Sequence, residues 1–207
     1  MDLNFQKNFS LRSFNTFGIN VQSKQFIGIK SNEELQYVLR QKKDEKILII
    51  GGGSNLLLTR DFEGLTLRIE SRGIEIIRED RESVTVKVAA GENWHEFVLW
   101  CLENNLGGVE NLALIPGSVG AAPIQNIGAY GAELKYIFSS CEAISVSNGA
   151  MKTFSKEACK FSYRNSIFKN ELKGQYVITS VNFILNKAPH SINDSFKGLS
   201  EKMEGKN

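Results

Sequence analysis

The pattern of apolar and polar positions in the first third of the chain predicts a small unit of strands with one helix. Ser31 and Glu34 have the spacing of a capping box, and apolar residues at helical spacing follow them. The wholly apolar run 47–50 predicts a buried strand that leads directly into a glycine-rich loop. Further strands are expected at residues 25–30, 56–58 and 65–69.

The pattern changes near residue 71, which indicates a second unit. Residues 84–88 alternate with period two, as a half-buried strand does. Asn93 is placed to cap a helix whose apolar residues recur at helical spacing from Trp94 onward. Late strands are expected at 141–147 and 176–185, and a weak helical face at Phe196, Leu199 and Met203. We therefore expect an α+β chain with units at 1–70 and 71–188, while 189–207 opens a further region.

Composition and charge exclude several classes of partner. The chain is 42% apolar and 23% charged, so it can build a core, and 25 basic against 23 acidic residues leave a net charge of +2. No basic cluster suggests nucleic acid or an anionic membrane, and no apolar run is long enough to cross a bilayer. Cys101, Cys141 and Cys159 are odd in number and form no C-x-x-C pair. Together with the lack of an apolar leader, they predict reduced thiols in a cytoplasmic protein.

The same composition removes two common kinds of catalytic site. The chain has only two histidines and no Cys/His cluster, so no metal site is expected. No G-x-S-x-G sequence supplies the serine of a hydrolase. Any chemistry is therefore expected to come from a bound cofactor.

Residues 51–55, Gly-Gly-Gly-Ser-Asn, form a candidate anion site. Successive glycines can direct their N–H groups toward one point and let a ligand approach the backbone. The loop lacks the Lys-Ser/Thr of a Walker A motif, and the residues that follow do not resemble the helix of a Rossmann fingerprint. The alternative interpretation is a plain glycine-rich turn between two strands.

Residues 107–131 are the most unusual segment of the chain. They hold six of its 18 glycines, two of its three prolines and a single charged residue, Glu110. Neither a regular strand nor a helix tolerates this composition, and a solvated loop of such length would carry more charge. The segment therefore predicts irregular backbone packed against a large, flat and mostly apolar ligand.

Five segments resemble the UDP-N-acetylenolpyruvoylglucosamine reductase family and occur in the same order along the chain as in that family. One is the unusual segment, with Ile-Pro-Gly-Ser-Val-Gly at 115–120 followed by Gln-Asn-Ile-Gly-Ala-Tyr-Gly at 125–131. The other four are Asn-Thr-Phe-Gly at 15–18, the loop 51–55, Ala-Gly-Glu-Asn-Trp at 90–94, and Phe-Ser-Tyr-Arg-Asn-Ser-Ile-Phe-Lys at 161–169. The resemblance implies a two-subdomain FAD-binding fold of the vanillyl-alcohol-oxidase (PCMH) type.

The resemblance also implies the chemistry and the residues. Such a reductase passes hydride from NADPH through FAD to the enolpyruvyl group of a UDP-sugar, a step in peptidoglycan synthesis. Arg164 matches the catalytic arginine of the family, and Tyr163 with Arg164 would bind substrate; a guanidinium can hold the enolate-like charge that forms beside a carboxylate. The residues implied to bind FAD are Gly51, Gly52, Gly53, Ser54, Asn55, Ile115, Pro116, Gly117, Ser118, Gly120, Asn126, Gly128, Ala129 and Tyr130.

The chain departs from the family pattern near its end. Full-length members continue into a third domain, which supplies a proton-donating serine in a Gly-Ser-x-Phe-Lys-like context and a late glutamate; neither context occurs here. Phe196 stands where the family places a substrate-binding tyrosine. Flavin binding is therefore expected more firmly than turnover. Two alternatives stay open: a non-catalytic flavin- or nucleotide-binding module, and a flavoprotein oxidase on the same scaffold.

Overall fold

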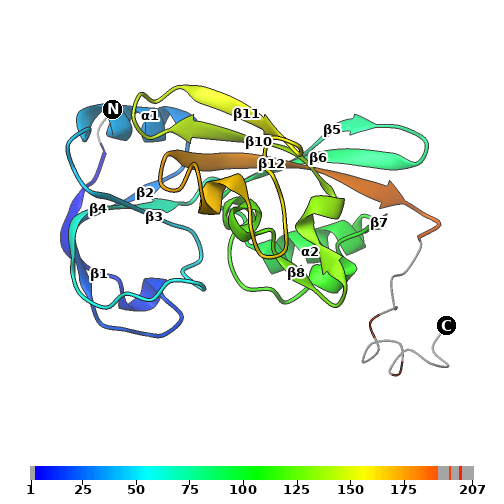
Figure 1. Ribbon diagram of the computed structural model, residues 1–207, viewed down its shortest axis with the longest axis horizontal. Coiled ribbons are helices and arrows are strands. Elements are labelled where there is room, and N and C mark those ends of the chain that lie inside the picture. Colours follow the sequence, from blue (N-terminus) through cyan, green and yellow to red (C-terminus); the bar gives the residue numbers. More distant parts are fainter. Residues whose placement is uncertain (1–2, 191–195, 197–200, 202–207) are drawn as a thin grey trace.

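Two β-sheets divide the molecule, and the strands of the first all precede those of the second (Figure 1). The computed structural model describes residues 3–190, 196 and 201. The first sheet has four strands in the order β1-β2-β4-β3. The elements of this first unit are β1 (Gln6–Ser10), the 3-10 turn η1 (Arg12–Phe14), β2 (Gln22–Ile29), α1 (Asn32–Gln41), β3 (Ile47–Ile50) and β4 (Phe62–Ile69).

Helix α1 begins where the capping pattern predicts. Ser31 has extended backbone, and its side chain accepts the N–H of Glu34 at 3.2 Å. In a capping box the Glu34 carboxylate would accept the N–H of Ser31. Here it accepts the N–H of the preceding residue, Lys30, at 2.7 Å. The apolar stripe of the helix packs on β2 and β4, with Val38 completely buried. This helix covers one face of the first sheet.

Strand β3 lies at the edge of the first sheet, and its surroundings differ from the prediction. Only Ile50 is buried, while Ile47, Leu48 and Ile49 are half-buried because no further strand covers that edge. Strands β3 and β4 are parallel, so the chain must return along the sheet between them. Residues 56–58 belong to that return connection, and the strand predicted there is therefore wrong.

The second sheet has six strands, five of them in the order β11-β10-β12-β6-β5, with β7 added beside β12. All its pairings are antiparallel. The elements of this second unit are β5 (Ile74–Glu79), β6 (Ser83–Ala89), α2 (Trp94–Glu103), β7 (Leu106–Gly107), η2 (Glu110–Leu112), η3 (Val119–Gln125), β8 (Gly128–Ala129), β9 (Ala132–Glu133), η4 (Leu134–Tyr136), β10 (Phe138–Ser145), β11 (Met151–Ser155), η5 (Ile167–Lys169) and β12 (Tyr176–Lys187). Strands β8 and β9 form a separate two-stranded sheet.

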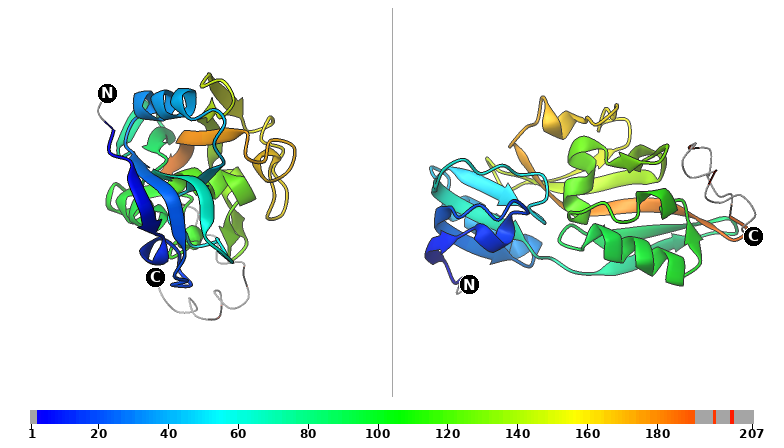
Figure 2. Two further views of the ribbon diagram at one scale, coloured as in Figure 1. Left: turned by 90° about the vertical axis from the view of Figure 1, so that its left-hand side faces the viewer. Right: turned by 90° about the horizontal axis from the view of Figure 1, so that it is seen from below.

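One face of the second sheet carries the main core. Helix α2 and η3 lie beneath this face (Figures 1 and 2). Trp94 and Phe97 of α2 pack edge-on and stacked against Phe183 of β12, with ring centroids 5.8 and 5.0 Å apart. Asn93 caps the helix by accepting the N–H of Glu96 at 3.1 Å, as its position predicts. The large side chains of α2 thus attach this helix to the second sheet, and η3 lies beneath the same face of that sheet.

The two units share apolar contacts at their junction. Ala90, Ile144 and Val177 from the second unit belong to the same buried cluster as Ile29 and Leu39 of the first. A packed interface of this kind holds the two sheets in a defined relation. A groove lies between the two sheets, and this packing therefore fixes its place in the fold.

The end of the chain contributes little that can be compared with the prediction. Leu199 and Met203 of the expected helical face lie outside the described residues. Phe196 is described, and its ring lies 5.6 Å from the ring of Tyr130. Among the described residues, none of the helices combines the length and the apolar character that crossing a membrane requires.

Candidate functional site

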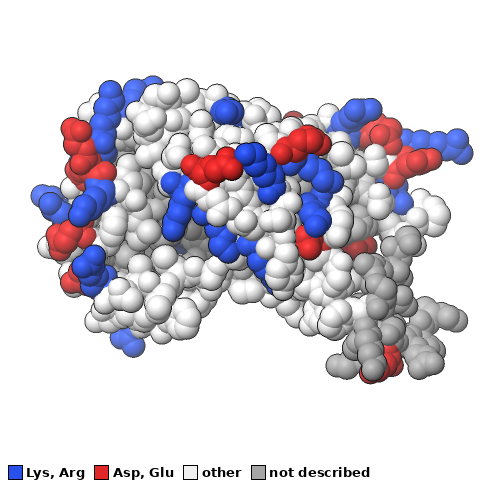
Figure 3. All heavy atoms as spheres, in the orientation of Figure 1, with Lys and Arg blue, Asp and Glu red and all other residues white. Residues whose placement is uncertain are grey.

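A groove runs between the two units. It consists of two adjoining cavities of about 260 and 520 Å³. Both are bordered by β3 on one side and by η3 on the other, and Figure 3 shows a hollow at this junction with Lys and Arg side chains at its border. The residues that line both cavities are Ile49, Ile50, Gly51, Ser118, Ala121 and Ile124. The half-buried side chains of β3 therefore face the groove.

The three glycines of loop 51–55 let two backbones meet at the floor of the groove. A Cβ on Gly52 would lie 2.9 Å from the Cα of Gly117, and one on Gly51 would overlap the Ser118 side chain. Gly53 has φ +66° and would overlap the carbonyl of Phe14. The close approach of the chain to itself is thus sufficient to explain these glycines.

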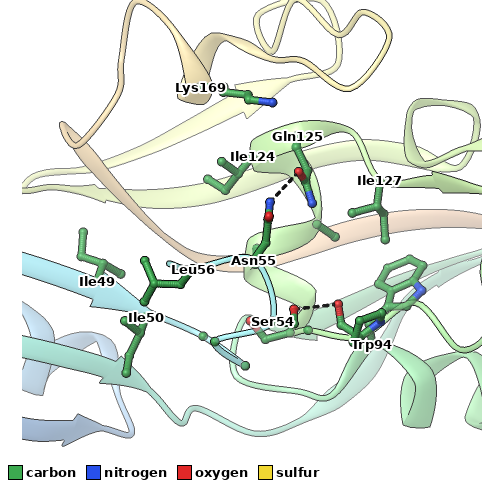
Figure 4. Close-up of a pocket in the computed structure, with 18 residues that line it drawn as sticks. Ile49, Ile50, Ser54, Asn55, Leu56, Trp94, Ile124, Gln125, Ile127 and Lys169 are labelled. Atoms are coloured by element: carbon green, nitrogen blue, oxygen red, sulfur yellow. Dashed lines mark hydrogen bonds between the residues drawn. The ribbon is translucent and has the colours of Figure 1, made fainter. Parts of the chain in front are cut away.

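Two hydrogen bonds join the loop to the second unit. The Ser54 hydroxyl donates to the carbonyl of Pro116 at 3.1 Å, and the Asn55 side-chain amide donates to that of Gln125 at 2.9 Å. Figure 4 shows both bonds as dashed lines. They connect residues that are 62 and 70 positions apart in the sequence. The loop, the residues just before η3 and the last residue of η3 therefore form one wall.

This wall offers backbone donors. Among the described residues, no hydrogen bond uses the N–H groups of residues 52–55, 117 or 118 as donors. All six residues line the smaller cavity. Lys169 lines the same cavity, and Lys43 and Lys173 line the larger one together with Glu45. Unpaired N–H groups beside ammonium groups suit an anion with several oxygens, such as a diphosphate.

The apolar content of residues 107–131 has a second cause that the sequence argument did not include. Leu112, Val119 and Ile127 are buried in the core beneath the second sheet. Part of the segment thus packs against the protein itself, and the part that lines the groove is 116–118, 120–122, 124–125 and 127. The low charge of the segment therefore reflects its own core as well as the groove.

The predicted site residues divide into two groups. Residues 51–55, Pro116, Gly117, Ser118 and Gly120 line the groove. The others do not line either cavity: Ile115, Asn126, Gly128, Ala129, Tyr130, Tyr163 and Arg164.

Tyr163 and Arg164 lie on a tight turn outside the groove. Ser162 and Asn165 exchange two backbone hydrogen bonds of 3.1 Å, which places Tyr163 and Arg164 at the two central positions. Both side chains are exposed, and the Arg164 guanidinium donates to the carbonyl of Gly128 at 2.6 Å. The turn is thus attached to residues 128–129, and the catalytic role of Arg164 stays a prediction.

Several residues of the groove were not predicted. Gln125 lies inside a motif but was not singled out, and Trp94 was interpreted as a packing residue. Trp94 does pack, since it is 1% exposed and its indole N–H donates to the carbonyl of Leu112 at 2.7 Å, but its ring also borders the smaller cavity. Lys169, Lys43 and Tyr176 also line the groove. Nothing in the local pattern distinguishes the two lysines from ordinary surface residues.

The remaining candidates for chemistry lie elsewhere. Among the described residues, no group of three or more His, Cys, Asp or Glu side chains is arranged to hold a metal ion. His95 is half-buried, and its Nδ1 accepts the N–H of Leu114 at 3.3 Å. The three cysteines are buried free thiols, and burial raises the pKa of Cys101. The pKa of Cys141 is raised by a hydrogen bond with Cys159 and by burial. None of these groups faces the groove.

Comparisons with known proteins identify relatives of the chain. Residues 23–155 match the family described as FAD binding domain. The chain is 51% identical over 205 residues to UDP-N-acetylenolpyruvoylglucosamine reductase of Flavobacterium johnsoniae, which covers 99% of this chain and 61% of the relative. It is 45% identical over 192 residues to the reductase of Pseudomonas fluorescens, covering 92% and 56%. The chain thus spans a little over half the length of these curated relatives.

Solved structures share the fold. The crystal structure of UDP-N-acetylenolpyruvylglucosamine reductase from Thermus caldophilus matches with a TM-score of 0.74 at 20% identity, over 100% of this chain and 71% of that chain. p-Cresol methylhydroxylase matches with a TM-score of 0.58 at 18% identity, over 82% and 37%. The predicted α+β fold of the vanillyl-alcohol-oxidase type is confirmed. The chain belongs to the FAD binding domain family, and over nearly its whole length it is similar to part of the UDP-N-acetylenolpyruvoylglucosamine reductases.

Proposed function

We propose that this chain is the FAD-binding part of a cytoplasmic reductase that makes UDP-N-acetylmuramate from UDP-N-acetylglucosamine enolpyruvate with NADPH. Residues 1–70 and 71–188 act as the two subdomains that clamp FAD, and 189–207 begin the region that follows. The identity of 45–51% to reductases over nearly the whole chain supports this assignment. The reaction is a step of peptidoglycan precursor synthesis.

The wall of unpaired N–H groups carries the proposal. FAD contains a diphosphate, and residues 52–55, 117 and 118 provide donors that no other group of the described chain uses. Hydrogen bonds from backbone N–H groups to charged oxygens are among the stronger ones in proteins. Lys169 adds a positive charge on the opposite side of the same cavity (Figure 4). The larger cavity beside β3 offers room for a ring system next to Tyr176. The residues present therefore fit FAD.

Tyr163 and Arg164 are the residues proposed to act on the substrate. FAD, when bound, would supply the hydride-transfer chemistry that couples NADPH oxidation to reduction of the enolpyruvyl double bond. Negative charge then develops next to the substrate carboxylate, and the planar guanidinium of Arg164 can hold two oxygens in a fixed orientation. Donors placed for such charge typically lower the barrier by about 3–4 kcal/mol. The Tyr163 side chain is 80% exposed and free to orient the substrate.

Two measurements on the purified chain test this function. The first is a titration of the cofactor-free chain with FAD, followed by flavin fluorescence and by the melting temperature. A chain that stays colourless and shows no thermal shift with excess FAD would contradict the proposal. The second is NADPH oxidation with and without UDP-N-acetylglucosamine enolpyruvate, in which substrate-dependent oxidation is expected.

The alternative functions give different results in the same assays. A non-catalytic flavin- or nucleotide-binding module would bind FAD without substrate-dependent turnover. The observation that favours it is that Tyr163 and Arg164 do not line the groove. An oxidase would consume oxygen with another substrate, and only the shared fold of oxidases supports that interpretation.

A further inference from the structure

Asn126 is a buried polar residue whose side chain is fully used within the protein. It is 0% exposed. Its Nδ2 donates to the Glu133 carboxylate at 2.6 Å and to the carbonyl of Ser162 at 3.0 Å, and its Oδ1 accepts the N–H of Lys135 at 3.0 Å. These partners fix the orientation of the amide, because a carboxylate and a carbonyl only accept while a backbone N–H only donates. Asn126 therefore has no side-chain donor left for a ligand in the groove.

The partners of Asn126 connect three separate segments. Residue 126 ends η3 with a left-handed backbone, φ +46°, which asparagine tolerates well. Glu133 belongs to β9, the second strand of the small β8–β9 hairpin, and Ser162 begins the turn 162–165. One amide thus links η3, this hairpin and the turn that carries Arg164.

The turn 162–165 depends on such anchors. Arg164 has φ +53°, a conformation that costs free energy for a residue other than glycine and persists only where the surroundings impose it. Four contacts hold the turn from outside: Asn126 to the Ser162 carbonyl, Lys169 Nζ to the Arg164 carbonyl at 3.0 Å, the Arg164 guanidinium to Gly128 at 2.6 Å, and Asn170 Nδ2 to the Asn165 side-chain oxygen at 2.9 Å. Among the side chains that donate these four bonds, only that of Asn126 is buried.

Charge around Asn126 makes the amide difficult to replace by a carboxylate. Glu133 forms an ion pair with Lys135 at 2.8 Å, and the hydrogen bond with Lys135 is the main cause that lowers the pKa of Glu133. A carboxylate at position 126 would face this ionised group and would also lack the N–H that Ser162 accepts. The Asn126→Asp substitution therefore keeps the shape and removes both donors.

We propose that Asn126 is a positioning residue that acts through the turn 162–165 and sets where Tyr163 and Arg164 stand relative to the groove. This inference rests on the proposed function, in which these two residues bind the substrate. It replaces the cofactor contact that the sequence resemblance implied for the Asn126 side chain.

The test compares Asn126→Asp with the control Asn182→Asp. Asn182 is a half-buried amide on the opposite face of the second sheet, where its Nδ2 donates to Ser140 at 2.9 Å. The chain has five tyrosines, so labelling with 3-fluorotyrosine gives few fluorine resonances, and Tyr163→Phe identifies that of Tyr163. We expect the Tyr163 resonance to shift or split in Asn126→Asp and to stay unchanged in Asn182→Asp. We expect the Kd for FAD to change less than twofold in both.

A second variant keeps the test decisive if Asn126→Asp does not fold. Asn126→Gly suits the left-handed backbone and adds no charge, so it is expected to fold and to move the Tyr163 resonance. A tenfold or larger rise in the Kd for FAD with an unmoved Tyr163 resonance would overturn the proposal and make Asn126 a cofactor contact. An unmoved resonance with unchanged FAD binding would overturn it too, as would failure of both variants to fold.

The two readouts also separate this inference from the proposed function. If the unmodified chain binds FAD but does not reduce the substrate, the proposed reductase activity fails while the resonance of Tyr163 still reports on Asn126. If substrate does reoxidise the reduced flavin, we expect Asn126→Asp to lower the maximal rate more than tenfold at a nearly constant KM. A structural role alone would lower the maximal rate only in proportion to the fraction of folded chain, whereas the positioning role lowers the rate per bound flavin.

Discussion

The Gly52→Ala substitution tests whether the meeting of the two loops creates the FAD site. The new Cβ would lie 2.9 Å from the Cα of Gly117 and 3.2 Å from its carbonyl carbon. Carbon atoms pack best at about 3.5–4.0 Å, so the two backbones must separate by about 0.6–1 Å. Forcing an extra carbon into a packed site costs about 1–3 kcal/mol. The backbone angle φ at Gly52 is not positive, so alanine adds no conformational strain there.

This separation should weaken FAD binding more than it weakens the fold. It moves the N–H groups of loop 51–55 away from those at residues 117 and 118, and a hydrogen bond to a charged group contributes about 1.5–3 kcal/mol. Losing one of them corresponds to at least about tenfold in the Kd for FAD. The assay is a titration with FAD followed by quenching of flavin fluorescence, with the melting temperature measured on the same samples.

Gly149→Ala is the matched control. Gly149 lies in the turn between β10 and β11 with φ +71° and has no atom within 4 Å of the added carbon, so its cost is conformational, about 1–2 kcal/mol. We expect the two variants to be destabilised to a similar degree, while only Gly52→Ala loses FAD affinity. Equal Kd values for both variants would refute the reasoning, because the loops would then not need their close approach to bind the cofactor.

Three further predictions concern the same region. The Asn55–Gln125 hydrogen bond joins the two units, so Asn55→Ala and Gln125→Ala should each weaken FAD binding by about 1 kcal/mol. The double variant should bind FAD no more weakly than either single variant, and additive losses of affinity would show that the pair does not act together. Arg164→Lys should keep FAD affinity and slow the reoxidation of reduced flavin by substrate about tenfold or more, because a point charge cannot replace the guanidinium fork; an unchanged rate would exclude the proposed role. The pKa of Glu133 is lowered from 4.5, first by its hydrogen bond with Lys135, so the unfolded chain takes up this proton at a higher pH than the folded chain. The contribution of Glu133 is therefore present above about pH 4.5 and is lost as the pH falls through the folded pKa, and Glu133→Gln should flatten the urea-unfolding stability across that range; identical pH profiles would contradict this.

The elements that sequence reasoning placed correctly are those with strong local signals. Ser31 and Asn93 start helices because a side-chain oxygen near the first turn satisfies a free N–H, and this depends on neighbouring residues alone. The return connection at 56–58 could not be recognised, since its apolar residues resemble a strand and only the parallel pairing of β3 with β4 excludes one. Local periodicity carries no information about that pairing.

The site was predictable where a motif lies on the groove itself. Loop 51–55 was identified from its glycines and residues 116–118 through the resemblance to a family, although the structure explains these glycines first by loop packing. Lys43 and Lys173 reach the groove only through the tertiary fold. The network of Asn126 likewise joins residues up to 36 positions apart, and no local pattern predicts such contacts.

Hydrogen exchange at single amides, with and without saturating FAD, tests the central claim most directly. The claim is that the unpaired N–H groups of residues 52–55, 117 and 118 form the cradle for the diphosphate of FAD. In the free chain these six amides should exchange rapidly, since no described residue accepts their hydrogens. With FAD bound, their exchange should slow strongly, while the amides of the β10–β11 turn stay unchanged. Exchange at the six amides that is equally fast with saturating FAD would contradict the account.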